Sequence, residues 1–259
     1  MRRTLTLAAA LTALTAAALA PAQAITNGEP DDAHPYVGLV VAYGADGAPP
    51  SVCSGAFLDA DTFVTAGHCF DDPTSTVEIR LGEGPLDSSV PTVGEVASVH
   101  HHPRYDAADF SAHDLAVVQL VKPLSTEVLD EFAELPEQDV LDALTPSVRT
   151  TFTVVGYGWT RASTPEAGRQ VSTFERMVAH PRLLKINHKE TGEGSFVVSA
   201  NSNTGGTCLG DSGGPVLLDG TDVVAGVVSY GKNALCAGQS GIYRVDRADD
   251  LEFLSAYVG

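Results

Sequence analysis

Six consecutive residues, Gly-Asp-Ser-Gly-Gly-Pro at 210–215, place a serine where neither a helix nor a strand is favoured. Glycine adopts backbone conformations that other residues avoid, so the chain can turn sharply there and expose the hydroxyl of Ser212. A serine hydroxyl is a weak nucleophile unless a base removes its proton and hydrogen-bond donors stabilise the oxyanion. The motif therefore predicts a nucleophilic serine whose oxyanion donors are the backbone N–H groups of Gly210 and Ser212.

Two other segments offer the base and the acid that such a serine needs. His68 lies in Thr-Ala-Gly-His-Cys, after an apolar run, and Asp114 precedes the apolar run Leu-Ala-Val-Val-Gln-Leu. An imidazole can take the proton of Ser212, and a carboxylate can orient that imidazole. Each segment alone also has a structural explanation: a core histidine, a strand-capping aspartate and a glycine turn. Their joint occurrence in the order His, Asp, Ser favours a catalytic triad.

Residues 1–24 are typical of a secretory signal peptide. Two arginines precede an uncharged run rich in Ala and Leu, and the segment ends in the small-x-small pattern Ala22-Gln23-Ala24. A retained membrane anchor is the alternative interpretation. We expect the segment to be removed and the protein to be secreted, without a membrane anchor.

The chain is acidic, with a formal net charge of −18. Removal of Arg2 and Arg3 with the leader leaves 13 basic against 33 acidic residues, a formal charge of −20. Such a surface repels nucleic acid and anionic lipid, which argues against both as partners. We expect a monomer with no cofactor, whose partners are protein or peptide substrates and proteinaceous inhibitors.

From Ile25 onward, short β-branched or alternating runs are separated by Gly, Pro and Asp-Gly turns, which predicts an all-β fold. The expected strands are Tyr36–Val41, Ala56–Val64, Val77–Leu81, Ala116–Val121, Thr151–Val155, Phe196–Ser199, Pro215–Leu218 and Val223–Ser229.

One helix is expected near the C-terminus. Asp249 and Asp250 suit its first turn, and Leu251, Leu254 and Val258 fall on one face. The acidic stretch 127–142 is interpreted as a connection between two halves of the fold.

The four cysteines are even in number, as expected for two disulfides in an exported chain, although the count alone allows three pairings. No Cys-x-x-Cys spacing indicates zinc. The consecutive histidines 100–102 do not favour a metal site either, because neighbouring side chains on a strand point to opposite faces. We therefore expect no bound metal.

Together, the segments around His68, Asp114 and Ser212 resemble the chymotrypsin/trypsin-type serine proteases, in a bacterial-style version with few disulfides. The resemblance implies one domain over 25–259, all-β, in which two six-stranded antiparallel β-barrels with a C-terminal helix pack together, their boundary near 122–150. It implies that Ser212 attacks the peptide carbonyl, that His68 transfers the proton and that Asp114 orients His68. It also implies the disulfide pairs Cys53–Cys69 and Cys208–Cys236.

The resemblance further implies an activation switch. Ile-Thr-Asn-Gly at 25–28 is similar to the mature N-terminus of these enzymes, whose freed amine pairs with the aspartate before the catalytic serine, here Asp211. Because Ala24 precedes Ile25 directly, signal peptidase could release this amine itself. Export and activation would then be one event, whereas cleavage after Ala22 would leave a latent form.

By the same resemblance, the substrate pocket is expected to be open and neutral. Gly206 stands at the floor, where trypsin-like members have aspartate, so a large apolar or aromatic residue before the scissile bond is expected. The expected substrate-binding residues are Gly206, Thr207, Ser229, Tyr230, Gly231 and Gly241. The competing interpretation is a catalytically inactive binding protein on the same fold, although the three triad residues are present. An esterase with Gly-x-Ser-x-Gly would need a strand–elbow–helix context that is missing here.

Overall fold

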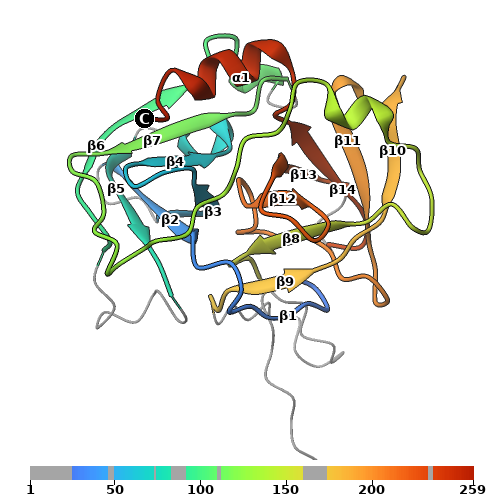
Figure 1. The fold of residues 1–259 in the computed structure, drawn as a ribbon, viewed down its shortest axis with the longest axis horizontal. Coiled ribbons are helices and arrows are strands. Elements are labelled where there is room, and N and C mark those ends of the chain that lie inside the picture. Colours follow the sequence, from blue (N-terminus) through green and yellow to red (C-terminus); the bar gives the residue numbers. More distant parts are fainter. Residues whose placement is uncertain are drawn as a thin grey trace, which may run out of the picture.

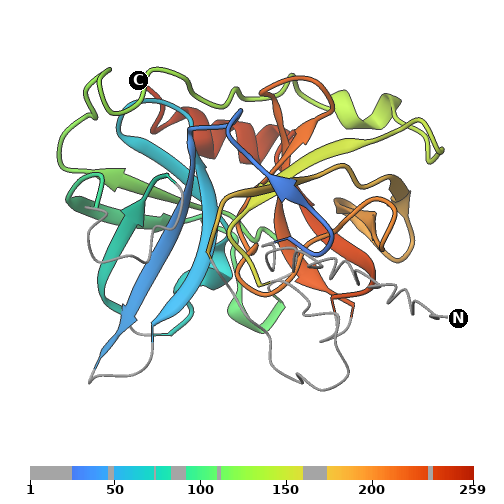
Figure 2. The same ribbon diagram turned by 90° about the horizontal axis from the view of Figure 1, so that it is seen from below.

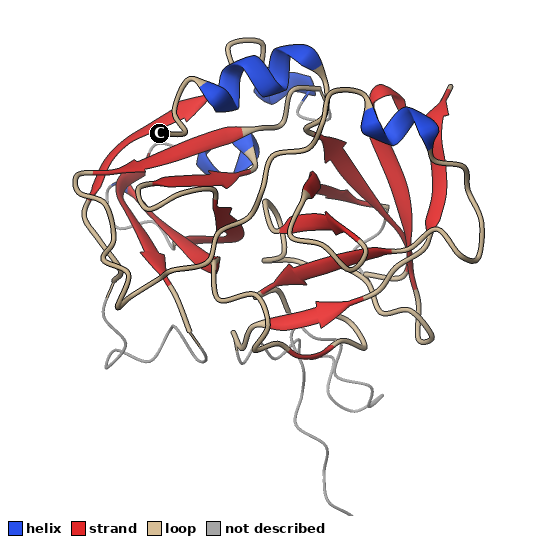
Figure 3. Ribbon diagram, in the orientation of Figure 1, coloured by secondary structure: helices blue, strands red, loops and turns tan. Residues whose placement is uncertain are grey.

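Strands dominate the computed structural model, as the short alternating runs of the sequence predict (Figure 3). The structure describes residues 25–45, 50–72, 74–82, 92–109, 112–159, 174–232 and 236–259. The expected signal peptide, residues 1–24, lies outside the described residues. The strands form two curled antiparallel sheets that lie side by side (Figure 1), which confirms the all-β, chymotrypsin-like fold.

The first sheet has six strands, hydrogen-bonded in the order β5-β2-β3-β4-β7-β6. These are β2 (Val37–Gly44), β3 (Ser51–Phe57), β4 (Thr62–Thr65), β5 (Thr74–Arg80), β6 (Val96–His101) and β7 (Ala116–Leu120). The two edge strands meet, because the N–H of Val93, just before β6, donates to the carbonyl of Ile79 in β5 at 3.0 Å. This bond brings the two edges of the curled sheet together.

The second sheet has eight strands in the order β1-β9-β8-β12-β13-β14-β11-β10. These are β1 (Glu29–Pro30), β8 (Phe152–Gly156), β9 (Met177–Ala179), β10 (Leu183–His188), β11 (Gly192–Ala200), β12 (Pro215–Leu218), β13 (Val224–Gly231) and β14 (Gly238–Arg244). Only residues 180–182 separate β9 from β10, yet β9 pairs with β8 and β10 with β11 on the other side of the sheet. Pro181 interrupts the ladder because proline has no N–H to donate. With β9 and β10 taken as one bent strand, and β1 as an edge addition (Figure 2), this barrel also has six strands.

One strand prediction was wrong. The run Ala56–Val64 is not one strand but β3 and β4, joined by a turn that begins at Asp59. The Asp59 carboxylate accepts the backbone N–H of Asp61 at 3.1 Å and of Thr62 at 2.7 Å. Aspartate favours such turns because its side chain replaces a backbone acceptor.

The helices are short. The structure has the 3-10 helices η2 (Gly67–Phe70), η3 (Ala107–Asp109) and η4 (Val140–Ala143), and the α-helix α1 (Ala248–Ser255). The expected C-terminal helix is confirmed, but its buried apolar residues are Phe253 and Leu254, and Val258 lies beyond its end. No helix in the described ranges has the length and apolar character needed to cross a membrane.

A continuous apolar core joins the two barrels. The larger cluster fills the first barrel, includes Phe253 and Leu254 of α1, and continues to Val155, Leu217 and Val227 of the second barrel. A second cluster, around Phe152 and Phe196, fills the second barrel. Because apolar side chains interdigitate across the interface, the barrels keep one relative orientation, and residues from both can form one site.

Substitution of Phe63 tests this packing. The Phe63 ring is fully buried and lies 4.8 Å from the ring of Phe57, edge to face. A Cβ added at Gly55 would lie 2.3 Å from the same ring, so the neighbouring strand is already in close contact with it. We predict that Phe63→Ala lowers the free energy of unfolding by about 3–5 kcal/mol and that Phe63→Leu costs less than half as much. Equilibrium urea unfolding measures both, and a loss below about 1 kcal/mol for Phe63→Ala would contradict the packing described.

Candidate active site

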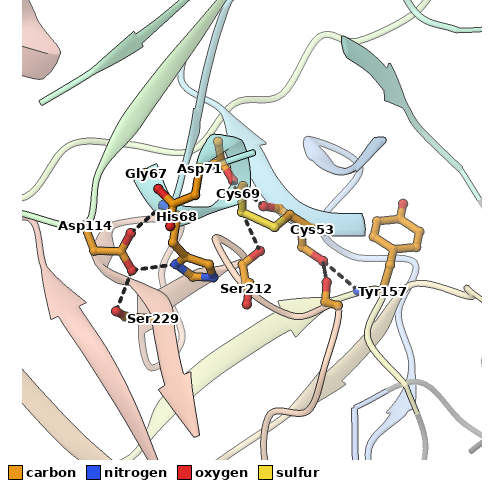
Figure 4. Close-up of a disulfide and its surroundings, with 12 residues drawn as sticks. Cys53, Gly67, His68, Cys69, Asp71, Asp114, Tyr157, Ser212 and Ser229 are labelled. Carbon is orange, nitrogen blue, oxygen red and sulfur yellow. Dashed lines mark hydrogen bonds and ion pairs between the residues drawn. A yellow bond between two sulfur atoms is a disulfide. The ribbon is translucent and has the colours of Figure 1, made fainter. Parts of the chain in front are cut away.

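His68 is fixed at one end of the first barrel. It lies in η2, directly after β4, and the disulfide Cys53–Cys69 ties this turn to β3. Glycine is required before it, because a Cβ at Gly67 would lie 2.9 Å from the ring of Tyr105. The imidazole is therefore presented at the surface of the barrel that faces the second barrel (Figure 4).

Asp114 is fully buried and has three hydrogen-bond donors. One carboxylate oxygen accepts the backbone N–H of His68 at 2.9 Å. The other accepts Nδ1 of His68 at 2.8 Å and the hydroxyl of Ser229, from β13 of the second barrel, at 2.5 Å. Because a carboxylate accepts, Nδ1 of His68 carries the proton, and Nε2 is the nitrogen that can accept one from a serine. The residue before the aspartate, His113, has φ 55° and turns the chain so that Asp114 points inward.

The carboxylate also alters the titration of His68. Burial by itself lowers the pKa of the imidazole. The hydrogen bond and charge of Asp114, aided by the charge of Asp71, outweigh burial and raise the pKa of His68 above its ordinary value of 6.5.

Ser212 lies in a turn between Cys208 and β12, stabilised by glycines. Gly210 and Gly213 have φ of +93° and +76°, which other residues rarely adopt, and a Cβ at Gly213 would lie 2.0 Å from the hydroxyl of Thr65. Figure 4 shows Ser212 and Asp114 on opposite sides of the His68 ring. The structure thus brings the three predicted triad residues together from both barrels.

Two hydrogen bonds to carbonyl groups beside Ser212 fix the direction of two backbone N–H groups. The carbonyl of Leu209 accepts the N–H of Trp159 at 2.6 Å, and the carbonyl of Asp211 accepts the N–H of Gly214 at 2.9 Å. A trans peptide points its N–H opposite to its carbonyl, so both bonds fix the N–H groups of Gly210 and Ser212. Neither of these N–H groups donates a hydrogen bond within the described part of the chain. An oxyanion-binding site requires donors in this state.

Asp211 is buried beneath this turn. Its carboxylate accepts the backbone N–H of Gly158 at 2.7 Å and of Cys208 at 2.8 Å. A Cβ at Gly156 or Gly158 would lie 2.4 Å from the carboxylate, which explains the two glycines of the Gly-Tyr-Gly-Trp stretch. Burial raises the pKa of Asp211 to about 7, although the two backbone bonds oppose this shift.

The N-terminal segment lies on the second barrel. The side chain of Ile25 is fully buried in the second core, and the N–H of Gly206 donates to the carbonyl of Thr26 at 3.0 Å. Among the described residues there is no hydrogen bond or ion pair between Ile25 and Asp211. The nitrogen of Ile25 is part of a peptide bond in this unprocessed chain and carries no charge. Their pairing stays a prediction for the processed protein.

Sequence reasoning missed Ser54, in β3. Its N–H donates to the carbonyl of Ser212 at 2.7 Å, and its hydroxyl donates to the carbonyl of Gly210 at 2.9 Å. The hydroxyl also accepts the N–H of Tyr157 at 2.9 Å. One serine of the first barrel therefore positions the serine-bearing turn of the second. The sequence offers no signal for this, since the contacts cross about 100 residues or more of chain.

A pocket opens beside Ser212. Its lining residues are Thr207, Cys208, Leu209, Ser212, Val228, Ser229, Tyr230, Gly231, Cys236, Gln239 and Ser240. None of these described lining residues is charged. Within this lining, the buried hydroxyl of Thr207 donates to that of Ser240 at 2.7 Å. The disulfide Cys208–Cys236 forms part of the wall.

Two expected pocket residues, Gly206 and Gly241, are not among these lining residues. Gly206 pairs with Thr26, and a Cβ on it would lie 2.4 Å from Ala200. A Cβ at Gly241 would lie 2.2 Å from the ring of Tyr230, so this glycine provides room for the ring. A register shift between Val228 and Tyr230 in β13 accompanies this arrangement. Ser240, rather than Gly241, is the β14 residue that reaches the pocket together with Gln239.

The three consecutive histidines separate. His100 contacts the hydroxyl of Ser98 at 2.8 Å, and Nε2 of His101 lies 3.1 Å from the carbonyl of Gly67. His102 is buried and stacks on the ring of His113, with 4.7 Å between centroids. The three rings therefore do not chelate together.

The family model described as Trypsin matches residues 25–249, and the chain belongs to this family of serine endopeptidases. It is 29% identical to a trypsin of Saccharopolyspora erythraea over 74% of this chain and 80% of that protein. It is 28% identical to Trypsin 5G1 of Aedes aegypti over 74% of this chain and 70% of that protein. A solved structure titled HL collagenase has the same fold, with a TM-score of 0.72 at 19% identity, covering 90% of this chain and 97% of that one.

Ser54→Ala should disturb the serine-bearing turn. The substitution leaves the N–H of Tyr157 and the carbonyl of Gly210 without their partner, which should lower the free energy of unfolding by about 1–3 kcal/mol. We also expect peptide hydrolysis to slow roughly tenfold, mainly through kcat, because the oxyanion donors lose alignment. Steady-state kinetics and urea unfolding measure the two effects. Ser98→Ala, a serine on β6 outside this network, is the control, and an equal effect of both substitutions would contradict the role of Ser54.

Proposed function

We propose that this protein is a secreted serine endopeptidase in which Ser212, His68 and Asp114 act as the catalytic triad. The observation that carries the proposal is the 2.8 Å bond between Nδ1 of His68 and the buried Asp114, with Ser212 on the other side of the ring. The aligned N–H groups of Gly210 and Ser212 support it further.

The steps follow from this geometry. Nε2 of His68 takes the hydroxyl proton as the oxygen of Ser212 attacks the carbonyl carbon of the substrate, and the oxyanion binds the N–H groups of Gly210 and Ser212. Asp114 stabilises the imidazolium formed. His68 then gives the proton to the leaving amine, which leaves an acyl-enzyme on Ser212. Water hydrolyses this ester with His68 acting again as the base.

We further propose that large apolar or aromatic residues are preferred before the scissile bond. The support is a pocket whose described lining lacks a charged side chain and includes Val228, Leu209 and the Cys208–Cys236 disulfide. An Arg or Lys side chain would enter it without a counter-charge, which is unfavourable in a desolvated site. Thr207 and Ser240 add neutral hydroxyl groups, not a counter-charge, to this lining.

Activation is proposed to follow removal of residues 1–24. The support is the position of Ile25 in the second core and the burial of Asp211 with two backbone donors and no cation among the described residues. A buried carboxylate without a cationic partner is costly, and a freed amine at Ile25 would supply one.

Hydrolysis of a panel of peptide amides tests the proposal. We expect the processed protein to cleave after Phe or Leu far faster than after Arg, because of the neutral pocket, and Ser212→Ala to lose on the order of 10⁶ in kcat. Cleavage only after Arg would leave the triad in place and overturn the pocket assignment. If the correctly processed protein cleaved no peptide, the inactive binding protein would become the better interpretation.

The pH dependence of kcat/KM tests the role of Asp114. Activity requires neutral His68, and the pKa of His68 is raised, so activity should rise with pH with a midpoint above 6.5. Asp114→Asn removes the charge and hydrogen bond that raise this pKa, so the midpoint should move to lower pH while the maximum falls about 10⁴-fold. An unchanged midpoint in Asp114→Asn would exclude this account of His68. Asp72→Asn, an exposed residue near η2, is the matched control.

A further inference from the structure

The residue before Asp114 has a backbone conformation that most residues avoid. His113 has φ 55°, in the left-handed region, which is uncommon for a residue other than glycine. Such a conformation is unfavourable and persists only where the surrounding structure holds it. Because His113 directly precedes Asp114, its backbone sets the direction in which the Asp114 carboxylate leaves the chain. The contacts of His113 therefore bear on the orientation of the proposed triad.

The second barrel contacts His113 through the hydroxyl of Tyr243. Nδ1 of His113 lies 3.1 Å from this hydroxyl oxygen, and the two rings meet at 63° with their centroids 6.1 Å apart. The His113 ring also stacks on that of His102, with 4.7 Å between centroids and 11° between planes. The stacking limits how the imidazole can rotate, and the hydrogen bond to Tyr243 selects one position.

Tyr243 is itself fixed in the second sheet. It belongs to β14, where it pairs with Ser195 of β11 and Val227 of β13. Its side chain is buried, and its hydroxyl donates to Oδ1 of Asp250, in the first turn of α1, at 2.8 Å. A phenol has one proton to donate, so the Tyr243 oxygen accepts the hydrogen bond from His113. The bonds therefore run in one direction, from His113 through Tyr243 to Asp250.

The titratable groups around this hydroxyl favour that direction at neutral pH. Burial, with the charge and hydrogen bond of Asp250, raises the pKa of Tyr243, so the hydroxyl keeps its proton. Burial and the charge of Arg104 lower the pKa of His113, and lower that of His102 to about 4, so both imidazoles are neutral. Burial raises the pKa of Asp250 to about 6, which leaves it a carboxylate at neutral pH.

The other acid beside this network, Asp249, pairs with Arg104 at the edge of the cluster, where both side chains are partly exposed. Its Oδ2 also lies 3.6 Å from Nδ1 of His113, too far for a hydrogen bond. The Tyr243 hydroxyl is therefore the hydrogen-bond partner of this imidazole nitrogen.

Two hydroxyl groups of the second barrel thus contact two consecutive residues of the first. Ser229 of β13 donates to the Asp114 carboxylate at 2.5 Å, and Tyr243 of the adjacent strand β14 bonds His113. The bond from Ser229 satisfies the buried charge. The bond to Tyr243 restrains the backbone that presents this charge.

We propose that Tyr243 is a positioning residue for the triad. Its hydroxyl, fixed by Asp250, holds His113 in the left-handed conformation, and that conformation directs Asp114 toward His68. The inference rests on the proposed function, because it concerns the same carboxylate. The contact spans 130 residues of sequence, so no local motif indicates it.

The variant Tyr243→Phe removes the hydroxyl and keeps the ring. We expect kcat for peptide hydrolysis to fall roughly tenfold with little change in KM, because a slightly displaced carboxylate orients His68 less well. The pKa of His68 should also fall, since the hydrogen bond and charge of Asp114 are what raise it. Tyr36→Phe is the matched control and should change neither value: Tyr36 is also buried, and its hydroxyl donates to Asp222 at 2.6 Å.

NMR in the Ser212→Ala background measures the pKa of His68 without relying on activity. The ring protons of His68 are assigned by comparison with His68→Gln. A direct measurement is needed because the carboxyl group of Asp250, with a pKa of about 6, also affects the acid limb of a rate profile. If the parent cleaved no peptide, the proposed function would fail, whereas a lowered pKa of His68 in Tyr243→Phe would still support the positioning role.

Two double variants separate positioning from stability. His113→Asn removes the imidazole, and asparagine tolerates the left-handed conformation better than most residues. If Tyr243 acts through His113, Tyr243→Phe should have little further effect on the pKa of His68 in this background. Tyr243→Phe alone also leaves the carboxylate of Asp250 without its donor and should lower Tm. Combining it with Asp250→Leu should restore Tm but not kcat.

Three results would each overturn the proposal. The first is a pKa of His68 in Tyr243→Phe equal to that in Tyr36→Phe. The second is simple addition of the effects of Tyr243→Phe and His113→Asn on this pKa. The third is recovery of kcat together with Tm when Asp250→Leu is combined with Tyr243→Phe, because Tyr243 would then act through stability alone.

Discussion

The structure depends above all on the burial of one charged group, the carboxylate of Asp114, at the interface between the barrels. A carboxylate removed from water is unfavourable by several kcal/mol unless its oxygens accept hydrogen bonds. The first barrel supplies two donors, both from His68, and the second supplies the hydroxyl of Ser229. The same bonds that satisfy the charge orient the imidazole. The same three hydrogen bonds therefore stabilise the interface between the barrels and align the proposed base.

In the serine-bearing turn, the carbonyl groups accept hydrogen bonds from neighbouring segments, while two backbone N–H groups have no described acceptor. Trp159 and Gly214 donate to the carbonyls of Leu209 and Asp211, and the N–H groups of Gly210 and Ser212 on the opposite sides of these peptides donate to no described residue. Ser54 adds a link from the first barrel to the carbonyls of Gly210 and Ser212. In the proposed mechanism these N–H groups are oriented before the substrate binds, which is the condition for strong electrostatic stabilisation of a transition state.

The two ends of the described chain support this interface from outside. β1 pairs with β9 of the second barrel although it comes first in the sequence, and α1 packs into the core of the first barrel although it comes last. The second barrel is thus extended by a strand that precedes the first barrel in the sequence, and the first barrel is covered by a helix that follows the second. His102, directly after β6, stacks on His113, the residue before Asp114, and also lies against Asp250 of α1, so distant parts of the chain meet beside Asp114.

The amino-acid sequence by itself indicated the all-β fold class and singled out the residues proposed as the triad, whereas the cysteine count left three pairings open and only the family resemblance selected one. These features rest on local patterns: alternating strands, glycines at tight turns, and the motifs around His68, Asp114 and Ser212. Only the tertiary structure decided that Ser54 positions the serine-bearing turn, that Ser240 rather than Gly241 reaches the pocket, and that His102 meets His113 rather than its neighbours in sequence. The physical reason is that side-chain contacts are set by strand register and barrel closure. A single register shift in β13, or one turn stabilised by the Asp59 carboxylate, changes which residues face each other. No local sequence pattern indicates either feature.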